Sequence, residues 1–123
     1  MMKNYTVLIV EDSIVVIKFL TVVFKNAGFR VKTASDGFEA LEKAIKDDIN
    51  LIVTDLNMPQ MDGITLLKNL KENEDTKKIP VILMSSNTPD KKEISGSYAF
   101  LQKPFKENEI IRIAKKAVKD IYG

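Results

Sequence analysis

Short apolar runs alternate with longer amphipathic segments along this 123-residue chain, and this alternation limits its possible folds more than any other feature. Residues 7–10, 51–54 and 81–84 are almost wholly apolar and rich in Val and Ile. Strands that are buried on both faces have such solid apolar runs, and strands separated by helices pair in parallel. The pattern therefore predicts an α/β fold in which helices cover both faces of a parallel sheet.

Five strands and five helices are expected. The strands are predicted at residues 6–10, 30–34, 51–54, 81–84 and 98–102. The helices are predicted at 14–27, 37–46, 64–72 and 106–122, with a short fourth helix between 87 and 97. Ser13 and Gly28 mark the ends of the first helix, because serine caps helix N-termini and glycine ends helices. Ser95-Gly96-Ser97 ends the fourth helix early, so its extent stays open.

The composition excludes several classes of function. The chain has no cysteine and no histidine, which excludes disulfides, thiolate and histidine metal sites, serine-histidine triads and a phosphohistidine of its own. The net charge of +2 is too small to indicate nucleic acid or an acidic membrane as a partner. No apolar run approaches the roughly 20 residues of a membrane span, and no secretory signal is present. We therefore expect one cytoplasmic domain over residues 1–123, without an output domain.

Polar side chains follow four of the five predicted strands. Glu11 and Asp12 follow the first strand, Asp55 the third, Ser85 the fourth and Lys103 the fifth. Parallel sheets bind ligands outside the carboxyl ends of their strands, where these positions meet. The sequence therefore predicts a functional site that contains three carboxylates, a hydroxyl and a lysine.

These residue types favour phosphoryl chemistry assisted by a metal. Carboxylates packed together raise one another's pKa unless a cation is present, and oxygen ligands suit Mg²⁺ or Mn²⁺. With a metal bound, Asp55 can stay ionised and act as a nucleophile. Lys103 can then balance the charge of a phosphoryl group, and Ser85 can donate a hydrogen bond to it.

Four stretches in order carry a family resemblance. They are Val-Leu-Ile-Val-Glu-Asp at 7–12, the loop Asp-Leu-Asn-Met-Pro-Gln-Met-Asp-Gly at 55–63, Ile-Pro-Val-Ile-Leu-Met-Ser at 79–85 and Phe-Leu-Gln-Lys-Pro-Phe at 100–105. With them the chain resembles the CheY-like receiver domains of response regulators in two-component signalling, over essentially its whole length. The resemblance implies a flavodoxin-like, doubly wound five-stranded parallel sheet with strand order 2-1-3-4-5.

The resemblance also implies roles for the acidic residues. Asp55 would be the phosphoacceptor. Asp12 and Asp55 would bind Mg²⁺ through their carboxylates, Asn57 through its backbone carbonyl and Glu11 through water. Glu11 replaces the aspartate that is more common at its position, and we expect metal binding to survive this change.

Further roles follow from the same resemblance. Ser85 and Lys103 would bind the phosphoryl group. Phe100 would be an aromatic switch that becomes buried when Ser85 moves inward. Asn57 and Asn87 would tune the rate of dephosphorylation.

The function expected from the resemblance is a phosphorylation-driven switch rather than an enzyme. The chain would assist only its own phosphorylation and dephosphorylation. Its phosphate would come from a sensor histidine kinase or a histidine phosphotransferase, since the chain has no histidine. It would act as a monomer on a downstream protein, in a pathway of the chemotaxis or the phosphorelay type.

The first helix has apolar residues on two faces. One face, assigned to the core, consists of Ile17, Leu20, Phe24 and Ala27, and the nearly opposite face carries Val15, Phe19 and Val22. The second stripe is a docking surface for a helix of the phosphodonor, or an exposed stripe that is simply tolerated, or part of the core if the rotation of the helix is assigned wrongly.

Two other functions are alternatives to this switch. A degenerate receiver would bind partners without phosphorylation, which the intact acidic site, Ser85 and Lys103 argue against. A phosphatase of the haloacid-dehalogenase kind would need a second carboxylate two residues after the nucleophile, where this chain has Asn57.

Overall fold

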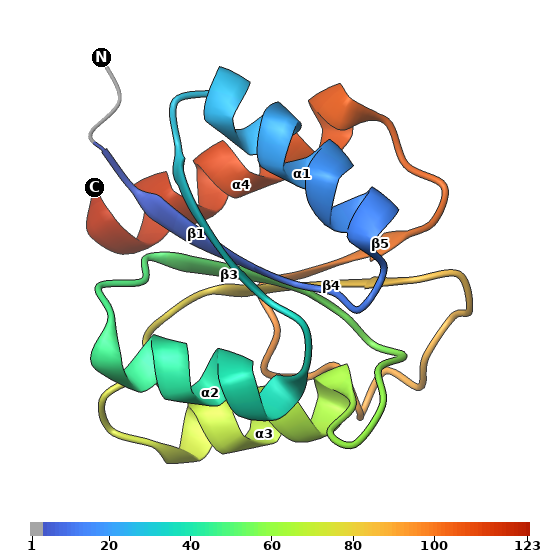
Figure 1. Cartoon of the computed structure of the whole chain (residues 1–123). Helices are drawn as coiled ribbons and strands as arrows, with labels where there is room; N and C mark the ends of the chain where they lie inside the picture. The colour runs from blue at the N-terminus through green and yellow to red at the C-terminus, as the bar shows by residue number, and fades with distance from the viewer. Residues whose placement is uncertain (1–3) are drawn as a thin grey trace.

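The computed structural model describes residues 4–123 and has one five-stranded sheet and four helices in that range (Figure 1). The strands are β1 (Thr6–Val10), β2 (Arg30–Ala34), β3 (Leu51–Asp55), β4 (Val81–Ser85) and β5 (Ala99–Gln102). The helices are α1 (Ile14–Asn26), α2 (Gly37–Lys46), α3 (Gly63–Glu72) and α4 (Glu107–Tyr122). The five strands and these four helices were all expected, with ends that differ by no more than one residue.

The sheet has the predicted order β2-β1-β3-β4-β5, and all four pairings are parallel. In its register Val10 lies opposite both Ala34 and Thr54, and Asp55 lies opposite Met84. The carboxyl ends of neighbouring strands therefore lie level at one edge of the sheet. The residues that follow these strands meet there.

Two apolar cores lie on opposite faces of the sheet. Along β1, Val7 and Ile9 belong to one core and Leu8 and Val10 to the other, because successive side chains of a strand point to opposite faces. Helices α1 and α4 cover the first face, and α2 and α3 cover the second (Figure 1). Burial on both faces explains why the central strands are apolar throughout. Within residues 4–123, no helix is both long and apolar enough to cross a membrane.

The two ends of α1 follow the predicted signals. Ser13 caps the helix, since its hydroxyl accepts a hydrogen bond from the Val16 N–H at 3.4 Å. Gly28 follows the C-terminus with φ +95°, a conformation that favours glycine. Of the expected core face, Leu20 and Phe24 are buried, whereas the remaining two residues, Ile17 and Ala27, are only half-buried.

The expectation of five helices was wrong, because residues 87–97 form bends and turns in place of a short fourth helix. The Glu93 N–H bonds to the Asp90 carbonyl at 3.0 Å, which is a turn rather than an α-helical bond. The Ser97 hydroxyl and its N–H both bond to the carbonyl of Ile94, at 2.7 and 3.0 Å. Serine side chains that bond to nearby carbonyls compete with helix formation, and a segment this short does not offset the cost of helix nucleation.

Candidate functional site

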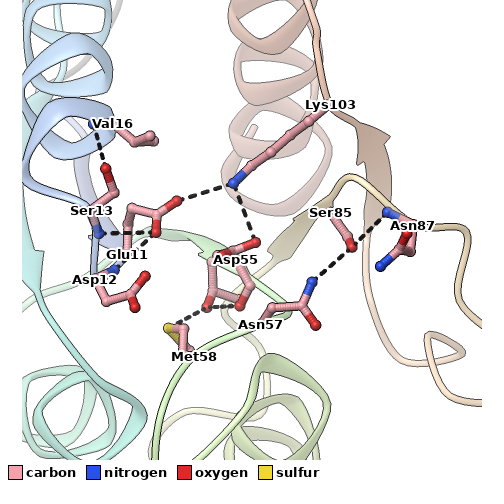
Figure 2. A network of polar contacts seen from close by, with 11 residues as sticks. Glu11, Asp12, Ser13, Val16, Asp55, Asn57, Met58, Ser85, Asn87 and Lys103 are labelled. Atoms are coloured by element: carbon pink, nitrogen blue, oxygen red, sulfur yellow. Dashed lines mark hydrogen bonds and ion pairs between the residues drawn. The ribbon is translucent and has the colours of Figure 1, made fainter.

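The predicted site residues meet at the carboxyl edge of the sheet (Figure 2). Asp55 and Ser85 are the last residues of β3 and β4, whereas they were expected to follow directly after these strands. Glu11 and Asp12 follow β1, and Lys103 follows β5. The parallel pairing of these strands brings together side chains that are up to 92 residues apart in sequence.

Glu11, Asp12 and Asp55 form an acidic cluster. Each offers a carboxylate oxygen, and these oxygens lie within 4.8 Å of one another. Glu11 and Asp55 are buried, while Asp12 is exposed. Burial raises the pKa of Glu11, and the nearby Asp12 side chain and the charge of Asp55 act in the same direction. Such a cluster is stable in its charged form only with positive charge close by.

The Glu11 carboxylate is largely occupied by donors of the protein itself. Its Oε2 accepts hydrogen bonds from the N–H groups of Asp12 at 2.9 Å and Ser13 at 3.2 Å. Its Oε1 accepts one from the Lys103 ammonium at 3.2 Å. The longer side chain of glutamate thus binds back to the backbone that leads into α1. Sequence reasoning missed this anchoring role of Glu11.

Lys103 lies between two carboxylates (Figure 2). Its ammonium is 3.2 Å from Glu11 Oε1 and 3.4 Å from Asp55 Oδ1. Burial lowers the pKa of Lys103, but the hydrogen bond to Glu11 and the charge of Asp55 outweigh burial and raise its pKa above the usual value. A positively charged ammonium thus adjoins Asp55 at neutral pH.

The donor set fits a divalent cation. Asp12 is exposed, and within the described residues its carboxylate oxygens accept no hydrogen bond from the protein. The Asn57 carbonyl likewise accepts no backbone hydrogen bond from residues 4–123. Two carboxylates, Asp12 and Asp55, and one carbonyl can therefore serve as oxygen ligands, which suits Mg²⁺ or Mn²⁺. Glu11 has its oxygens engaged elsewhere and is the weaker candidate as a ligand.

The Ser85 hydroxyl is held by both asparagines of the site. Ser85 Oγ accepts hydrogen bonds from Asn57 Nδ2 at 3.2 Å and from the backbone N–H of Asn87 at 3.1 Å. Phe100, on the neighbouring strand β5, is half-buried and packs against the core under α2 and α3. These residues were expected to lie near one another, but the bond between the Asn57 side chain and Ser85 was not expected.

Gly63 fixes the loop that follows Asp55. A Cβ atom at this position would lie 2.6 Å from the Asp55 carbonyl oxygen and 2.9 Å from Leu56 Cα, closer than real Cβ contacts allow. The Gly63 N–H also donates to the Leu56 carbonyl at 2.9 Å. Next to it, Asp62 caps α3 by accepting a hydrogen bond from the Thr65 N–H at 2.8 Å. Asp62 therefore has a structural role at the start of α3, outside the acidic cluster.

An apolar surface begins directly beside the site on α1. Val15, Phe19 and Val22 are 77%, 45% and 58% exposed, so the predicted outward stripe is not part of the core. Ile14, which the sequence analysis did not include, is 68% exposed at the start of the same helix. Leaving apolar side chains in water forgoes the free energy of their burial. We name these four residues the α1 surface.

Comparison with protein families and curated relatives gives consistent matches. A model of the response regulator receiver domain matches residues 7–115. The two-component response regulator ORR3 of Oryza sativa subsp. indica is 37% identical over 117 residues, which cover 91% of this chain and 89% of that protein. Chemotaxis protein CheY-3 of Vibrio cholerae is 34% identical over 108 residues, 84% of this chain and 83% of the relative. The chain spans only 54% of the probable transcriptional regulator ycf29 of Pyropia yezoensis, at 35% identity.

Solved structures with the same fold match over nearly the whole chain. The chemotaxis response regulator CheY4 of Vibrio cholerae has a TM-score of 0.86 at 31% identity, over 94% of this chain and 99% of that one. The receiver domain of the sensor histidine kinase PA1611 from Pseudomonas aeruginosa has a TM-score of 0.87 at 26% identity, over 95% and 99% of the two chains. That structure carries a magnesium ion in its active-site cleft.

Proposed function

This chain belongs to the family of response regulator receiver domains, which act in two-component signalling, and we propose that it is a phosphoacceptor switch. In this proposal Asp55 takes a phosphoryl group from the phosphohistidine of a sensor histidine kinase or a histidine phosphotransferase. A carboxylate oxygen of Asp55 bonds to phosphorus, and the bond between phosphorus and the imidazole nitrogen breaks. The observation that carries the proposal is the Asp55 carboxylate at the end of β3, with Lys103 at 3.4 Å and two further carboxylates beside it.

The other residues of the site would stabilise the transferred group. Phosphoryl transfer depends mainly on positioning and on neutralising charge. The Lys103 ammonium would shift from Glu11 and Asp55 towards the phosphoryl oxygens, and Ser85 would donate a hydrogen bond to one of them. Movement of Ser85 would then be accompanied by movement of Phe100, which changes the surface that a target protein contacts. Asn57 and Asn87 would set the lifetime of the phosphorylated state.

A divalent cation would be held by the carboxylates of Asp12 and Asp55 and the carbonyl of Asn57. When bound, Mg²⁺ or Mn²⁺ supplies positive charge that offsets the charge of the acidic cluster and of the phosphoryl group. Glu11 would contribute through water and would keep Lys103 in place by the contact at 3.2 Å.

The α1 surface would contact the phosphodonor. Its residues Ile14, Val15, Phe19 and Val22 are exposed, and the helix starts two residues after Asp12. A helix of the donor that packs against this surface would lie beside the edge of the sheet that carries Asp55. Such packing would bring the phosphohistidine close to Asp55 and would bury the apolar side chains.

Neither rival function has a specific observation in its favour. A receiver that binds partners without phosphorylation has no need of Lys103 beside Asp55 or of the free carboxylate of Asp12. A phosphatase of the haloacid-dehalogenase kind needs an acid at the position of Asn57, where the amide is bonded to Ser85.

The proposal is tested by phosphorylating the protein with acetyl phosphate and Mg²⁺ and locating the modification by mass spectrometry after reduction with borohydride. We expect modification at Asp55 and complete loss in Asp55→Asn. Asp62→Asn is the matched control, because Asp62 caps α3 and asparagine also caps helices. Modification that persists in Asp55→Asn, or that occurs at Asp62 in the wild type, would contradict the proposal.

A further inference from the structure

The Ser85 hydroxyl has a hydrogen-bond arrangement that its expected role does not require. Its oxygen accepts from Asn57 Nδ2 at 3.2 Å and from the Asn87 N–H at 3.1 Å, and both donors are seen in Figure 2. A hydroxyl can accept two hydrogen bonds and donate one. Both acceptor positions are thus used, and within residues 4–123 the hydroxyl hydrogen has no protein acceptor. Ser85 is only 2% exposed, so bulk water has little access to this hydrogen.

The two donors determine where the free hydrogen can point. It must be directed away from Asn57 and Asn87, since their N–H groups already face the oxygen. Asp55 is the last residue of β3, and Asn57 lies two residues further on in the loop that follows. The bond from Asn57 therefore places the Ser85 hydroxyl beside this loop, and an oxygen of a group bound at Asp55 would be a suitable acceptor.

We propose that the Asn57 side chain is a positioning residue that orients the Ser85 hydroxyl as a hydrogen-bond donor towards a group bound at Asp55. The inference rests on the proposed function, because the acceptor would be a phosphoryl oxygen. Without the amide, one lone pair of Ser85 Oγ is free and the hydroxyl can rotate among its staggered positions. The bond to Ser85 comes from the side-chain amide of Asn57, so this role is separate from that of its backbone carbonyl.

A double-mutant cycle on the full chain tests this role. The affinity for beryllofluoride, an analogue of the phosphoryl group, is measured by titration calorimetry with Mg²⁺ for the wild type, Asn57→Ala, Ser85→Ala and the double variant. We expect Asn57→Ala to weaken binding by about three- to tenfold, the value of one hydrogen bond. In the Ser85→Ala background the same change should weaken binding by less than about twofold. Equal effects in the two backgrounds would overturn the inference.

Two further variants separate orientation of the hydroxyl from a general effect on the loop. Ser85→Thr keeps a hydroxyl, so Asn57→Ala should again weaken binding in this background. Asn87→Ala keeps the backbone N–H that bonds to Ser85, so its effect should be the same with and without the hydroxyl. The inference would also be overturned if the effect of Asn87→Ala depended on the Ser85 hydroxyl. It would likewise be overturned if Asn57→Ala had no effect on binding in the Ser85→Thr background.

The proposed function and this inference fail in different ways. If the wild type does not bind beryllofluoride, or if Asp55→Asn binds it equally well, the phosphoacceptor function falls and the inference falls with it. If beryllofluoride binds at Asp55 but Asn57 and Ser85 act independently, only the positioning role is wrong.

Discussion

Lys103 donates a hydrogen bond to Glu11 Oε1 at 3.2 Å, across 92 residues of sequence. This contact is shorter than the 3.4 Å between the same ammonium and Asp55. Glu11 also accepts two backbone hydrogen bonds at the start of α1. The first two acidic residues of the cluster therefore differ in their surroundings, because Glu11 is buried and binds protein groups while Asp12 is exposed.

The metal site should distinguish Asp12 from Glu11. Asp12→Ala should weaken Mg²⁺ binding at least tenfold and abolish phosphorylation, because it removes a direct ligand. Its free energy of unfolding should change by no more than about 0.5 kcal/mol, because the Asp12 side chain is exposed. Glu11→Ala should weaken Mg²⁺ binding less but lower the free energy of unfolding by about 1–3 kcal/mol, because it leaves two backbone N–H groups without their acceptor and Lys103 with Asp55 as its remaining partner. Titration calorimetry and urea denaturation measure the two effects. A larger loss of Mg²⁺ binding in Glu11→Ala would reverse this order.

The Ser85 hydroxyl should be needed for the response to phosphorylation. Ser85→Ala should still accept phosphate at Asp55, since the nucleophile is unchanged. Phosphorylation should then alter target binding much less than in the wild type, where we expect a coupling of about 1–3 kcal/mol. The measurement is the affinity for the target with and without beryllofluoride. An unchanged response in Ser85→Ala would exclude the hydroxyl from the switch.

The α1 surface should matter for a protein donor and not for a small one. Phe19→Glu should slow phosphotransfer from the cognate histidine donor at least tenfold, because it places a charge in an apolar contact. Phosphorylation by acetyl phosphate should be nearly unchanged, since this donor needs no docking surface. Ile45→Glu, at an exposed apolar position of α2 on the other face of the sheet, is the matched control. Equal slowing with both donors would show that Phe19 serves the fold.

The N-terminus of α2 should give a measurable acid dependence of stability. The Ser35 N–H donates to Glu39 Oε1 at 2.8 Å, and this bond, together with Lys43 at 3.0 Å, lowers the pKa of Glu39 below 4.5. A lowered pKa in the folded state stabilises the protein above pH 4.5, and this contribution is lost as the pH falls through the folded-state pKa. Glu39→Gln should therefore be less stable than the wild type by roughly 0.5 kcal/mol at neutral pH, and this deficit should shrink as the pH falls below 4.5.

The control for this prediction is Glu42→Gln. Within residues 4–123, Glu42 pairs only with Lys46, at 3.4 Å on the exposed face of α2, and it does not bond to the helix N-terminus. Its loss of stability at neutral pH should be smaller than that of Glu39→Gln. A Glu39→Gln deficit that persists in acid would mean that packing, rather than the charge, is responsible.

The sequence alone was sufficient to predict the sheet and the place of the site. Solid apolar runs such as residues 7–10 require burial on both faces, and this requirement predicts parallel strands between helices. Parallel strands end at one edge, so Asp12, Asp55 and Lys103 could be placed together before any distance was known. The outward position of Phe19 on α1 could also be predicted, because helical periodicity indicates which side chains share a face.

Tertiary structure alone decided which groups are bonded to one another. The periodicity of a sequence predicts which face of a helix or strand is buried. A hydrogen bond, in contrast, requires two atoms to approach within about 3.5 Å at a suitable angle. The hydrogen bonds that Glu11 accepts from Ser13 and Lys103 therefore could not be predicted, and neither could the bond between Asn57 and Ser85. The turns at 87–97 depend on the same kind of contact, since the Ser97 hydroxyl bonds to the Ile94 carbonyl at 2.7 Å in place of a helical N–H. These choices depend on side-chain conformations that are fixed only when the strands and loops have packed.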